Sequence, residues 1–129
     1  MRKFIILVSL LASASFALTA CSPAPVATPA SKPVTIEVET DPNPAMMGDI
    51  TLTLAIKDEK GNPIEGARVD VAVDHTDMTG MGMSGPATEQ SDGKYAINAN
   101  FSMSGNWKMT VYVRKDSLDY KEDIDLKIK

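Results

Sequence analysis

The sequence predicts an all-β domain, an antiparallel two-sheet sandwich of the immunoglobulin-like kind with six or seven short strands. After residue 33, hydrophobic residues alternate with polar ones in several short runs, which is the period of a half-buried strand. Gly, Pro, Asn and Asp residues separate these runs at short intervals, and no stretch has a convincing helical period. A β-barrel is the alternative, and the single Cys excludes only the disulfide-bearing antibody pattern.

Alternating hydrophobic residues define the first three expected strands, at 34–40, 50–56 and 67–73. The sequence DPNP at 41–44 separates the first two strands as a turn or loop, because Pro and Asn favour turns. The sequence KGNP at 60–63 closes the second strand in the same way.

Three further strands are expected after a longer Gly- and Met-rich segment. A Ser-Asp-Gly turn precedes the strand at 95–99, and a Gly-Asn turn separates it from the strand at 107–113. Alternation at 124–128 gives the last strand. In this phase Trp107 and Met109 point into the core.

The first twenty residues resemble a secretory signal peptide. Arg2 and Lys3 precede an apolar run at 4–11, and small residues follow down to Cys21. The apolar run is too short for a transmembrane helix, which needs about 20 predominantly apolar residues. The sequence LTAC at 18–21 resembles the bacterial lipobox, in which cleavage precedes a Cys that receives lipid. A free Cys after ordinary cleavage is the alternative.

A lipid-modified Cys21 would hold the protein to a lipid bilayer, because each methylene group of its acyl chains that is buried in the bilayer contributes about 0.8 kcal/mol to the free energy of binding. Ser22, rather than Asp, follows it, which in Gram-negative lipoproteins indicates sorting to the outer membrane. We therefore expect an extracytoplasmic protein, lipid-anchored and facing the periplasm. Residues 21–33 are rich in Pro and Ala and predict an extended tether of roughly 35–40 Å. The folded domain would then occupy residues 34–129.

Charge and residue counts exclude several functional classes. Removal of residues 1–20 takes two of the 13 basic residues and none of the 17 acidic ones, so the net charge goes from −4 to −6. An acidic protein is a poor partner for nucleic acid, because phosphate binding needs a basic surface. One Cys rules out a Cys-based zinc site. With one His, no nucleophile motif and no phosphate-binding loop, we expect no enzymatic activity.

Soft-metal chemistry is concentrated in one segment, residues 74–86. It holds the only His, His75, together with Met78, Met81 and Met83, and its interleaved glycines make it loop-like. Thioether sulfur favours Cu(I) among biological metals, and imidazole binds copper in either oxidation state. The segment therefore predicts a Cu(I) site that would also take Ag(I). Zinc fits less well, because only one imidazole is present.

The remaining methionines leave two interpretations open. Met103 lies in the turn before Trp107 and would reach His75 if both turns occupy the same end of the sandwich, so we include it as a candidate metal ligand. Met46 and Met47 precede the second strand, and we expect them to pack rather than bind. Because Met also fills core gaps and adaptable binding surfaces, the alternative is a metal-free contact surface for a protein of the cell envelope.

A set of short motifs, taken in order, resembles the YtkA-like/FixH-like domains. The resemblance covers about residues 35–113 and implies an immunoglobulin-like sandwich, lipid-anchored or membrane-tethered outside the cytoplasm. It also implies copper handling, with a copper-transport or oxidase-assembly protein as the partner. His75 is not part of this pattern, so its candidacy depends on its chemistry alone. The motifs are GNPIEGARV at 61–69, MTGMGM at 78–83 with a Pro shortly after it, GKY at 93–95 and FSMSGNW at 101–107.

Overall fold

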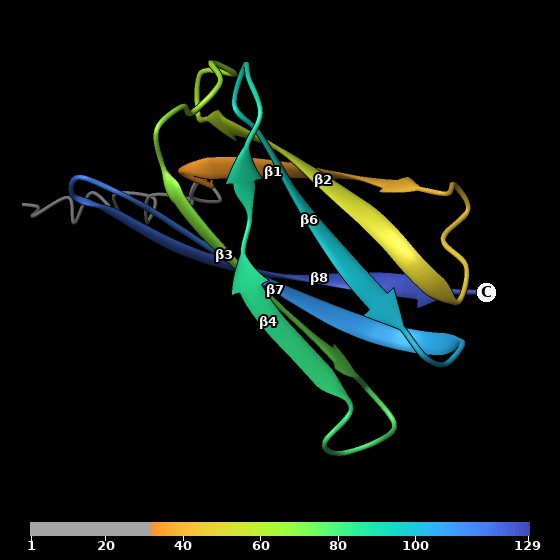
Figure 1. Cartoon of the computed structure of the whole chain (residues 1–129). Coiled ribbons are helices and arrows are strands. Elements are labelled where there is room, and N and C mark those ends of the chain that lie inside the picture. Colours follow the sequence, from red (N-terminus) through yellow and green to blue (C-terminus); the bar gives the residue numbers. More distant parts are fainter. Residues whose placement is uncertain (1–31) are drawn as a thin grey trace, which may run out of the picture.

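The computed structural model describes residues 32–129, so the expected signal peptide, Cys21 and most of the expected tether lie outside the described residues. Residues 32–129 form two stacked β-sheets in which all strand pairs are antiparallel (Figure 1). The predicted all-β sandwich is confirmed. In this part of the chain no helix is long and apolar enough to cross a membrane.

The first sheet has the strand order β1-β2-β6-β5. Its central strand β2 turns every second side chain into the core, as the alternating sequence predicts. Ile50, Leu52, Leu54 and Ile56 are each at most 1% exposed. The strands are β1 (Val34–Asp41), β2 (Gly48–Asp58), β5 (Thr88–Glu89) and β6 (Lys94–Phe101).

The second sheet has the strand order β4-β3-β7-β8. Strands β3 and β7 lie in its centre, and their valines face the first sheet. Strand β8 is an edge strand in which charged or polar residues alternate with half-buried ones, which discourages pairing with another chain. The strands are β3 (Arg68–His75), β4 (Gly82–Pro86), β7 (Gly105–Lys115) and β8 (Leu118–Ile128).

Large side chains from both sheets close the core. Tyr95 and Phe101 enter from β6, and Trp107 and Met109 enter from β7. All four are at most 2% exposed, so the predicted core positions of Trp107 and Met109 are confirmed. Burial on this scale is the main stabilising contribution, at about 1.5–3 kcal/mol for each fully buried large side chain.

The segment at 74–86 differs from the expected continuous loop. Strand β3 extends to His75, and β4 pairs with it, with Gly82 opposite Asp74 and Met83 opposite Val73. Gly82 fits closely against β3, because a Cβ at this position would lie 3.0 Å from the Val73 carbonyl oxygen and would displace the Asp74 carboxylate. The chain therefore has eight strands in the described residues, and the loop itself is reduced to residues 76–81.

Because the strands are antiparallel, the loops that connect them lie at two opposite ends of the sandwich (Figure 1). We define the entry end as the start of β1, the β2–β3 loop and the β7–β8 turn. The methionine end consists of the β1–β2 loop with Met46 and Met47, the β3–β4 loop with Met78 and Met81, and the β6–β7 turn with Met103. Strand β1 has eight residues, so the two ends are roughly 25 Å apart.

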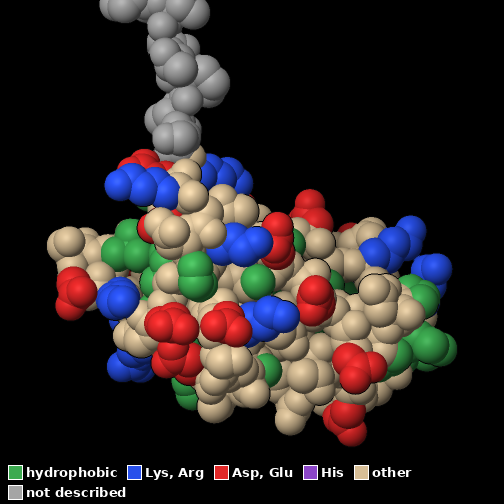
Figure 2. All heavy atoms as spheres, turned by 90° about the horizontal axis from the view of Figure 1, so that it is seen from above, with side chains coloured by type: hydrophobic (Ala, Val, Ile, Leu, Met, Phe, Trp, Pro, Cys, Tyr) green, Lys and Arg blue, Asp and Glu red, His purple; other side chains and the backbone are tan. Residues whose placement is uncertain are grey.

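The outer surface carries charges of both signs. On the face shown in Figure 2, acidic and basic side chains are interspersed. Elsewhere in the described residues, Lys57 Nζ and Glu37 form an ion pair across β1 and β2, at 3.0 Å. Such interspersion favours solubility without creating a field of a single sign.

Candidate metal centre

Met81, Met83 and Trp107 line one cavity of about 150 Å³ at the methionine end. Asn100 of β6, Ser102 just after that strand, and two glycines of the β3–β4 region complete its wall, so both sheets contribute. The volume is several times the roughly 30 Å³ that one water molecule occupies in the liquid, which leaves room for an ion and for movement of thioether ligands. The cavity therefore brings together two of the predicted metal ligands.

Local structure fixes the two cavity methionines in different ways. The His75 N–H donates to the Met81 carbonyl at 3.0 Å, which closes the β3–β4 loop and brings Met81 back beside the end of β3. Met83 is a strand residue, and its side chain also lines a smaller cavity of about 70 Å³ between the sheets with Val73 and Ile97. Both side chains are half-buried and pack against the core.

Trp107 forms a fixed wall beside these thioethers. Its ring meets Phe101 edge-to-face at 5.0 Å and 89°, and it meets His75 in a similar geometry at 5.0 Å and 76°. Its Nε1–H donates to the Met103 carbonyl at 3.2 Å. Edge-to-face pairs of this kind stabilise by about 0.5–1.5 kcal/mol beyond area burial, so the indole is held from three sides.

His75 lies at the same end, but it is not among the residues that line the cavity. Its Nδ1 accepts the Asp77 N–H at 3.2 Å, which assigns the proton of the neutral ring to Nε2. Nε2 faces the Ser104 carbonyl at 3.5 Å, the outer limit of a hydrogen bond. Gly105 packs against the ring, because a Cβ there would lie 2.8 Å from Nε2. Backbone groups therefore surround both ring nitrogens.

Met78 and Met103 lie near the cavity without lining it. Met78 is on the β3–β4 loop and is 45% exposed. Met103 is half-buried in the β6–β7 turn, and its carbonyl holds Trp107. The two turns do lie at one end, which was the condition for including Met103, because the Thr76 N–H donates to the Asn106 carbonyl at 3.0 Å.

Within residues 32–129, no three side chains of His, Cys, Asp or Glu converge as a metal site would require. The residues with a soft donor that line the cavity are Met81 and Met83. The lipidation candidate Cys21 lies outside the described residues.

The sequence pattern of the YtkA-like family matches residues 28–112, well over half of the chain. This chain belongs to the YtkA-like family. The family predicted from the ordered motifs is thereby confirmed. None of the curated proteins matches this YtkA-like chain.

Two solved structures of FetP from uropathogenic Escherichia coli are similar to this YtkA-like domain. A copper-bound variant of FetP is 18% identical with a TM-score of 0.45, over 73% of this chain and 84% of FetP. The as-isolated FetP, expressed in the periplasm, is 19% identical with a TM-score of 0.46, over 73% of this chain and 83% of FetP.

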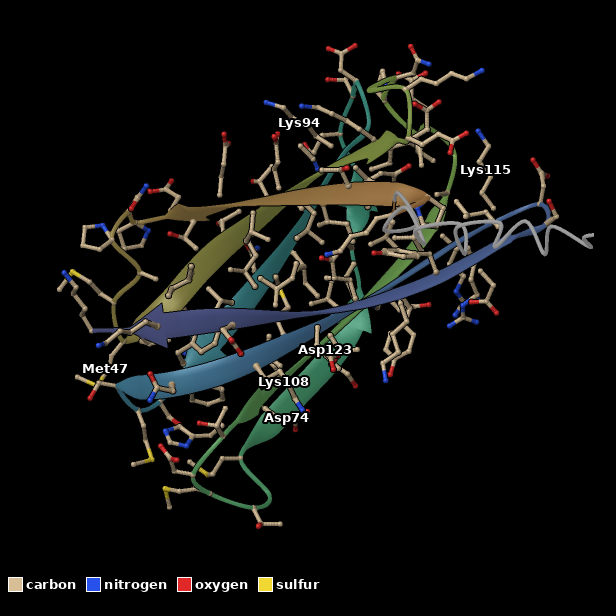
Figure 3. All side chains as sticks on the ribbon, turned by 180° about the vertical axis from the view of Figure 1, so that it is seen from behind. Met47, Asp74, Lys94, Lys108, Lys115 and Asp123 are labelled. Atoms are coloured by element: carbon tan, nitrogen blue, oxygen red, sulfur yellow. The ribbon has the colours of Figure 1, made fainter. Side chains whose placement is uncertain are left out.

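Two further methionines of this YtkA-like domain lie at the same end and, contrary to expectation, are exposed. Met46 and Met47 are 53% and 57% exposed, so the expectation that they pack is wrong. The preceding Ala45 is buried in their place, at 6% exposure. Figure 3 shows Met47 on the outside of the molecule, beside the end of β8 and the start of β7. In a loop without strand alternation, the sequence carries no signal for which of these neighbours faces the core.

Proposed function

We propose that this protein binds Cu(I), or Ag(I) by the same chemistry, at its methionine end and takes part in copper handling outside the cytoplasm. The observation that carries the proposal is the cavity at which Met81, Met83 and Trp107 meet. Thioether sulfur is a neutral, soft ligand that prefers Cu(I) to harder cations. An indole ring beside the ion would add a cation–π contact.

Two further methionines extend the candidate donor set. Met78 lies three residues before Met81 on the same loop, and its exposure leaves the side chain able to turn toward the cavity. Met103 lies in the turn that holds Trp107. Because these ligands carry no proton, binding through them would not depend on pH in the way that binding through thiolates does.

His75 would join the donor set only by exchanging a contact. Its Nδ1 would have to release the Asp77 N–H, whereas Nε2 faces the Ser104 carbonyl at the longer distance of 3.5 Å. In this tautomer Nδ1 holds the free lone pair, so it is the nitrogen that we expect to bind once the Asp77 N–H is released. Binding through Nε2 would need the ring proton to move to Nδ1, which would break the same contact.

The wider setting follows from the N-terminal sequence. We propose that Cys21 carries lipid and that residues 21–33 tether the domain to the periplasmic face of the outer membrane. Strand β1 starts at the entry end, so the methionine end would face away from the tether. A copper-transport or oxidase-assembly protein is the partner that we propose for ion transfer, and we propose a binding protein without catalytic activity.

Metal titration tests the proposal. The full-length chain in detergent, with Cys21→Ser to remove its thiol, is titrated with Cu(I) in competition with a chelator. Replacing Met78, Met81 and Met83 together by Leu should weaken Cu(I) binding at least tenfold, because Leu keeps the apolar volume and removes the sulfur. The matched control is Met109→Leu in the core, which should leave the affinity within twofold. Equal affinity of the triple variant and the unsubstituted protein would contradict the proposal.

The second candidate function is a metal-free contact surface for an envelope protein, and the exposure of Met46, Met47 and Met78 favours it. Contiguous apolar surface commonly marks protein contacts. Under this function the same Leu variants would keep partner binding, and recovery of the partner would not change when a Cu(I) chelator is added. A partner that binds only the metal-loaded protein would favour copper transfer instead.

A further inference from the structure

The methionine end carries thioethers at two depths. The large hydrophobic side chains that are exposed within residues 32–129 are Met46, Met47 and Met78, at 53%, 57% and 45%. Met81 and Met83 lie deeper, half-buried at the cavity. A surface that only contacts another protein would function equally well with Leu or Phe, yet all three of these exposed side chains carry sulfur. This composition indicates soft-ligand chemistry at the surface as well as inside.

The backbone on both sides of Met46 is fixed. The Lys129 N–H donates to the Ala45 carbonyl at 2.9 Å, and the Met47 N–H donates to the Lys129 carbonyl at 2.9 Å. Ala45 is buried beneath the loop. The loop that carries the two neighbouring methionines therefore has a fixed backbone, which lowers the entropy cost of binding a ligand there.

The β6–β7 turn connects this loop to the cavity. Gly48, directly after Met47, pairs with Phe101 at the end of β6. The Phe101 ring contacts Trp107, which lines the cavity. Met103 lies in the turn between these two aromatic residues. Pairing of Gly48 with Phe101 and the Phe101–Trp107 contact thus join the loop of Met46 and Met47 to the wall of the cavity, with Met103 in the turn between them.

We propose that Met46 and Met47 form an outer, weaker site for Cu(I) or Ag(I), which takes the ion from solution or from a donor and passes it to the cavity. The transfer is a ligand exchange in which an inner thioether replaces an outer one, so the ion keeps its charge and no electron moves. Two exposed neutral ligands hold the ion less tightly than a larger, partly dehydrated set. The proposal deepens the proposed function and rests on the inner site for its destination.

Silver titration with methionine-methyl NMR tests the outer site. The full-length Cys21→Ser chain in detergent, labelled with ¹³C at the Met methyl groups, is titrated with silver nitrate, and each signal is assigned by single Met→Leu substitutions. The methyls of Met81 and Met83 should shift first. Those of Met46 and Met47 should shift at silver concentrations at least tenfold higher. The double variant Met46→Leu/Met47→Leu should lose the second transition and keep the first within twofold.

The outcomes separate the two claims. Shifts confined to Met81 and Met83, with Met46 and Met47 unmoved at excess silver, would overturn the outer site and leave the proposed function standing. Shifts confined to Met46 and Met47 would support an outer site and contradict the cavity. No shift at any methyl would overturn both. Folding does not confuse the result, because the two substituted side chains are exposed.

Stopped-flow mixing tests the transfer step. Uptake of Cu(I) from a weak chelator should be at least fivefold slower in the Met46→Leu/Met47→Leu variant, with an equilibrium affinity for the inner site within twofold of that of the unsubstituted protein. The matched control is Met109→Leu, which should not change the rate. An equal uptake rate in the double variant would overturn the role of Met46 and Met47 in delivery.

Discussion

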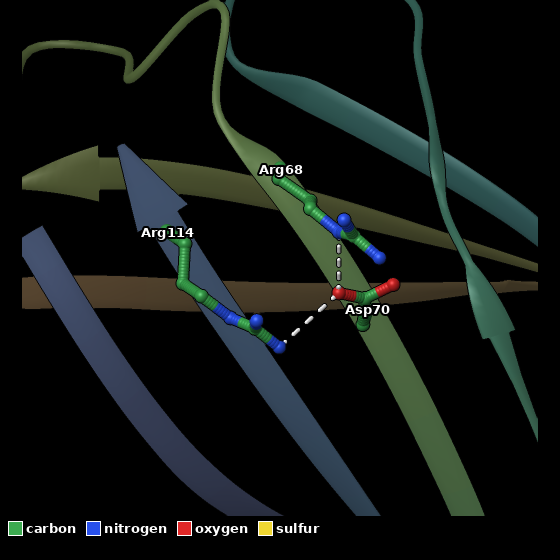
Figure 4. A network of polar contacts seen from close by, with 3 residues as sticks. All are labelled: Arg68, Asp70 and Arg114. Atoms are coloured by element: carbon green, nitrogen blue, oxygen red, sulfur yellow. Dashed lines mark hydrogen bonds and ion pairs between the residues drawn. The ribbon is translucent and has the colours of Figure 1, made fainter. Parts of the chain in front are cut away.

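The two ends of the sandwich are held together by different kinds of contact. At the entry end, side-chain hydrogen bonds and ion pairs join neighbouring strands and loops. Asp70 Oδ2 accepts from Arg68 Nε at 3.0 Å and from Arg114 Nη2 at 3.4 Å (Figure 4). Lys115 Nζ donates to the Glu65 carbonyl at 2.6 Å. Exposed pairs of this kind contribute about 0–1 kcal/mol each to the free energy of unfolding. At this end, the charged groups of Asp70, Arg68, Arg114 and Lys115 are thus engaged in contacts within the domain.

At the methionine end, aromatic edges and main-chain hydrogen bonds hold the loops together. Trp107 lies between Phe101 and His75, and the main chain of Lys129 forms two hydrogen bonds with the β1–β2 loop. These contacts use rings and peptide groups, and none of them uses a methionine sulfur. The Thr76 hydroxyl also donates to the Asn106 carbonyl at 2.9 Å, and the Asn100 amide donates to Asp49 at 2.7 Å. The comparison therefore shows that ion pairs join the entry end, whereas within the described residues the methionine end is joined by rings, main-chain groups and side-chain hydrogen bonds and has no ion pair.

The largest change in the free energy of unfolding is expected from a substitution that removes the aromatic contacts of the methionine end. Trp107→Ala removes the ring that Phe101 and His75 contact and leaves a cavity, so the free energy of unfolding should fall by about 3–5 kcal/mol. Urea unfolding monitored by circular dichroism measures the change. The exposed neighbour Lys108→Ala is the control and should change stability by about 0.5 kcal/mol or less. A loss below about 1 kcal/mol would show that the aromatic contacts do not hold this end.

A smaller effect is expected from the entry end and would sharpen the comparison. The buried Tyr95 hydroxyl donates to the Ile64 carbonyl at 2.8 Å and accepts the Ala67 N–H at 3.1 Å. Tyr95→Phe leaves both backbone groups unpaired and should lower the free energy of unfolding by about 1–3 kcal/mol. Silver affinity at the other end should stay within twofold. A variant that loses silver binding while still folded would mean that the two ends are coupled.

The smallest effect concerns the β2–β3 turn at the entry end. The Asn62 backbone N–H, and then its side-chain amide, hold the pKa of Asp58 below its ordinary value, with a further contribution from Lys60. A lowered pKa in the folded protein means that the carboxylate stabilises the fold above the unfolded pKa of about 4, and that this contribution is lost as the pH falls through the folded pKa.

Asp58→Asn should therefore lower the thermal midpoint slightly at pH 7, and the difference from the unsubstituted protein should vanish near pH 2. Thermal unfolding at pH 7, 4 and 2 measures both. A difference that persists unchanged at pH 2 would show that charge is not the cause.

Alternation of hydrophobic residues was sufficient to locate most of the sandwich. The four core residues of β2, and Trp107 and Met109 of β7, each lie in the phase that their sequence predicts, because the pleat alone decides which face they occupy. Strands β4 and β5 were missed for a physical reason. One is rich in Gly and the other has two residues, so neither carries a pattern, and both pair only because a longer strand is beside them.

The candidate site was predictable in its chemistry and only partly in its geometry. Residue type was sufficient to single out the loop methionines, and the topology brought Met103 to the same end. The contact of His75 with Ser104 depends on a turn 29 residues away, which no local pattern encodes, whereas its contact with Asp77 lies within its own loop. The exposure of Met46 likewise depends on Lys129, at the far end of the sequence.

The main-chain hydrogen bonds between Lys129 and the β1–β2 loop affect where an affinity tag should be attached to the protein. Any chain that continues past Lys129 leaves the domain beside Met47. A polyhistidine tag placed there would bring imidazole groups, which themselves bind copper, next to the thioethers. A tag attached before Val34 leaves by the opposite end, roughly 25 Å away along the eight residues of β1. Metal measurements on this protein therefore call for an N-terminal or removable tag.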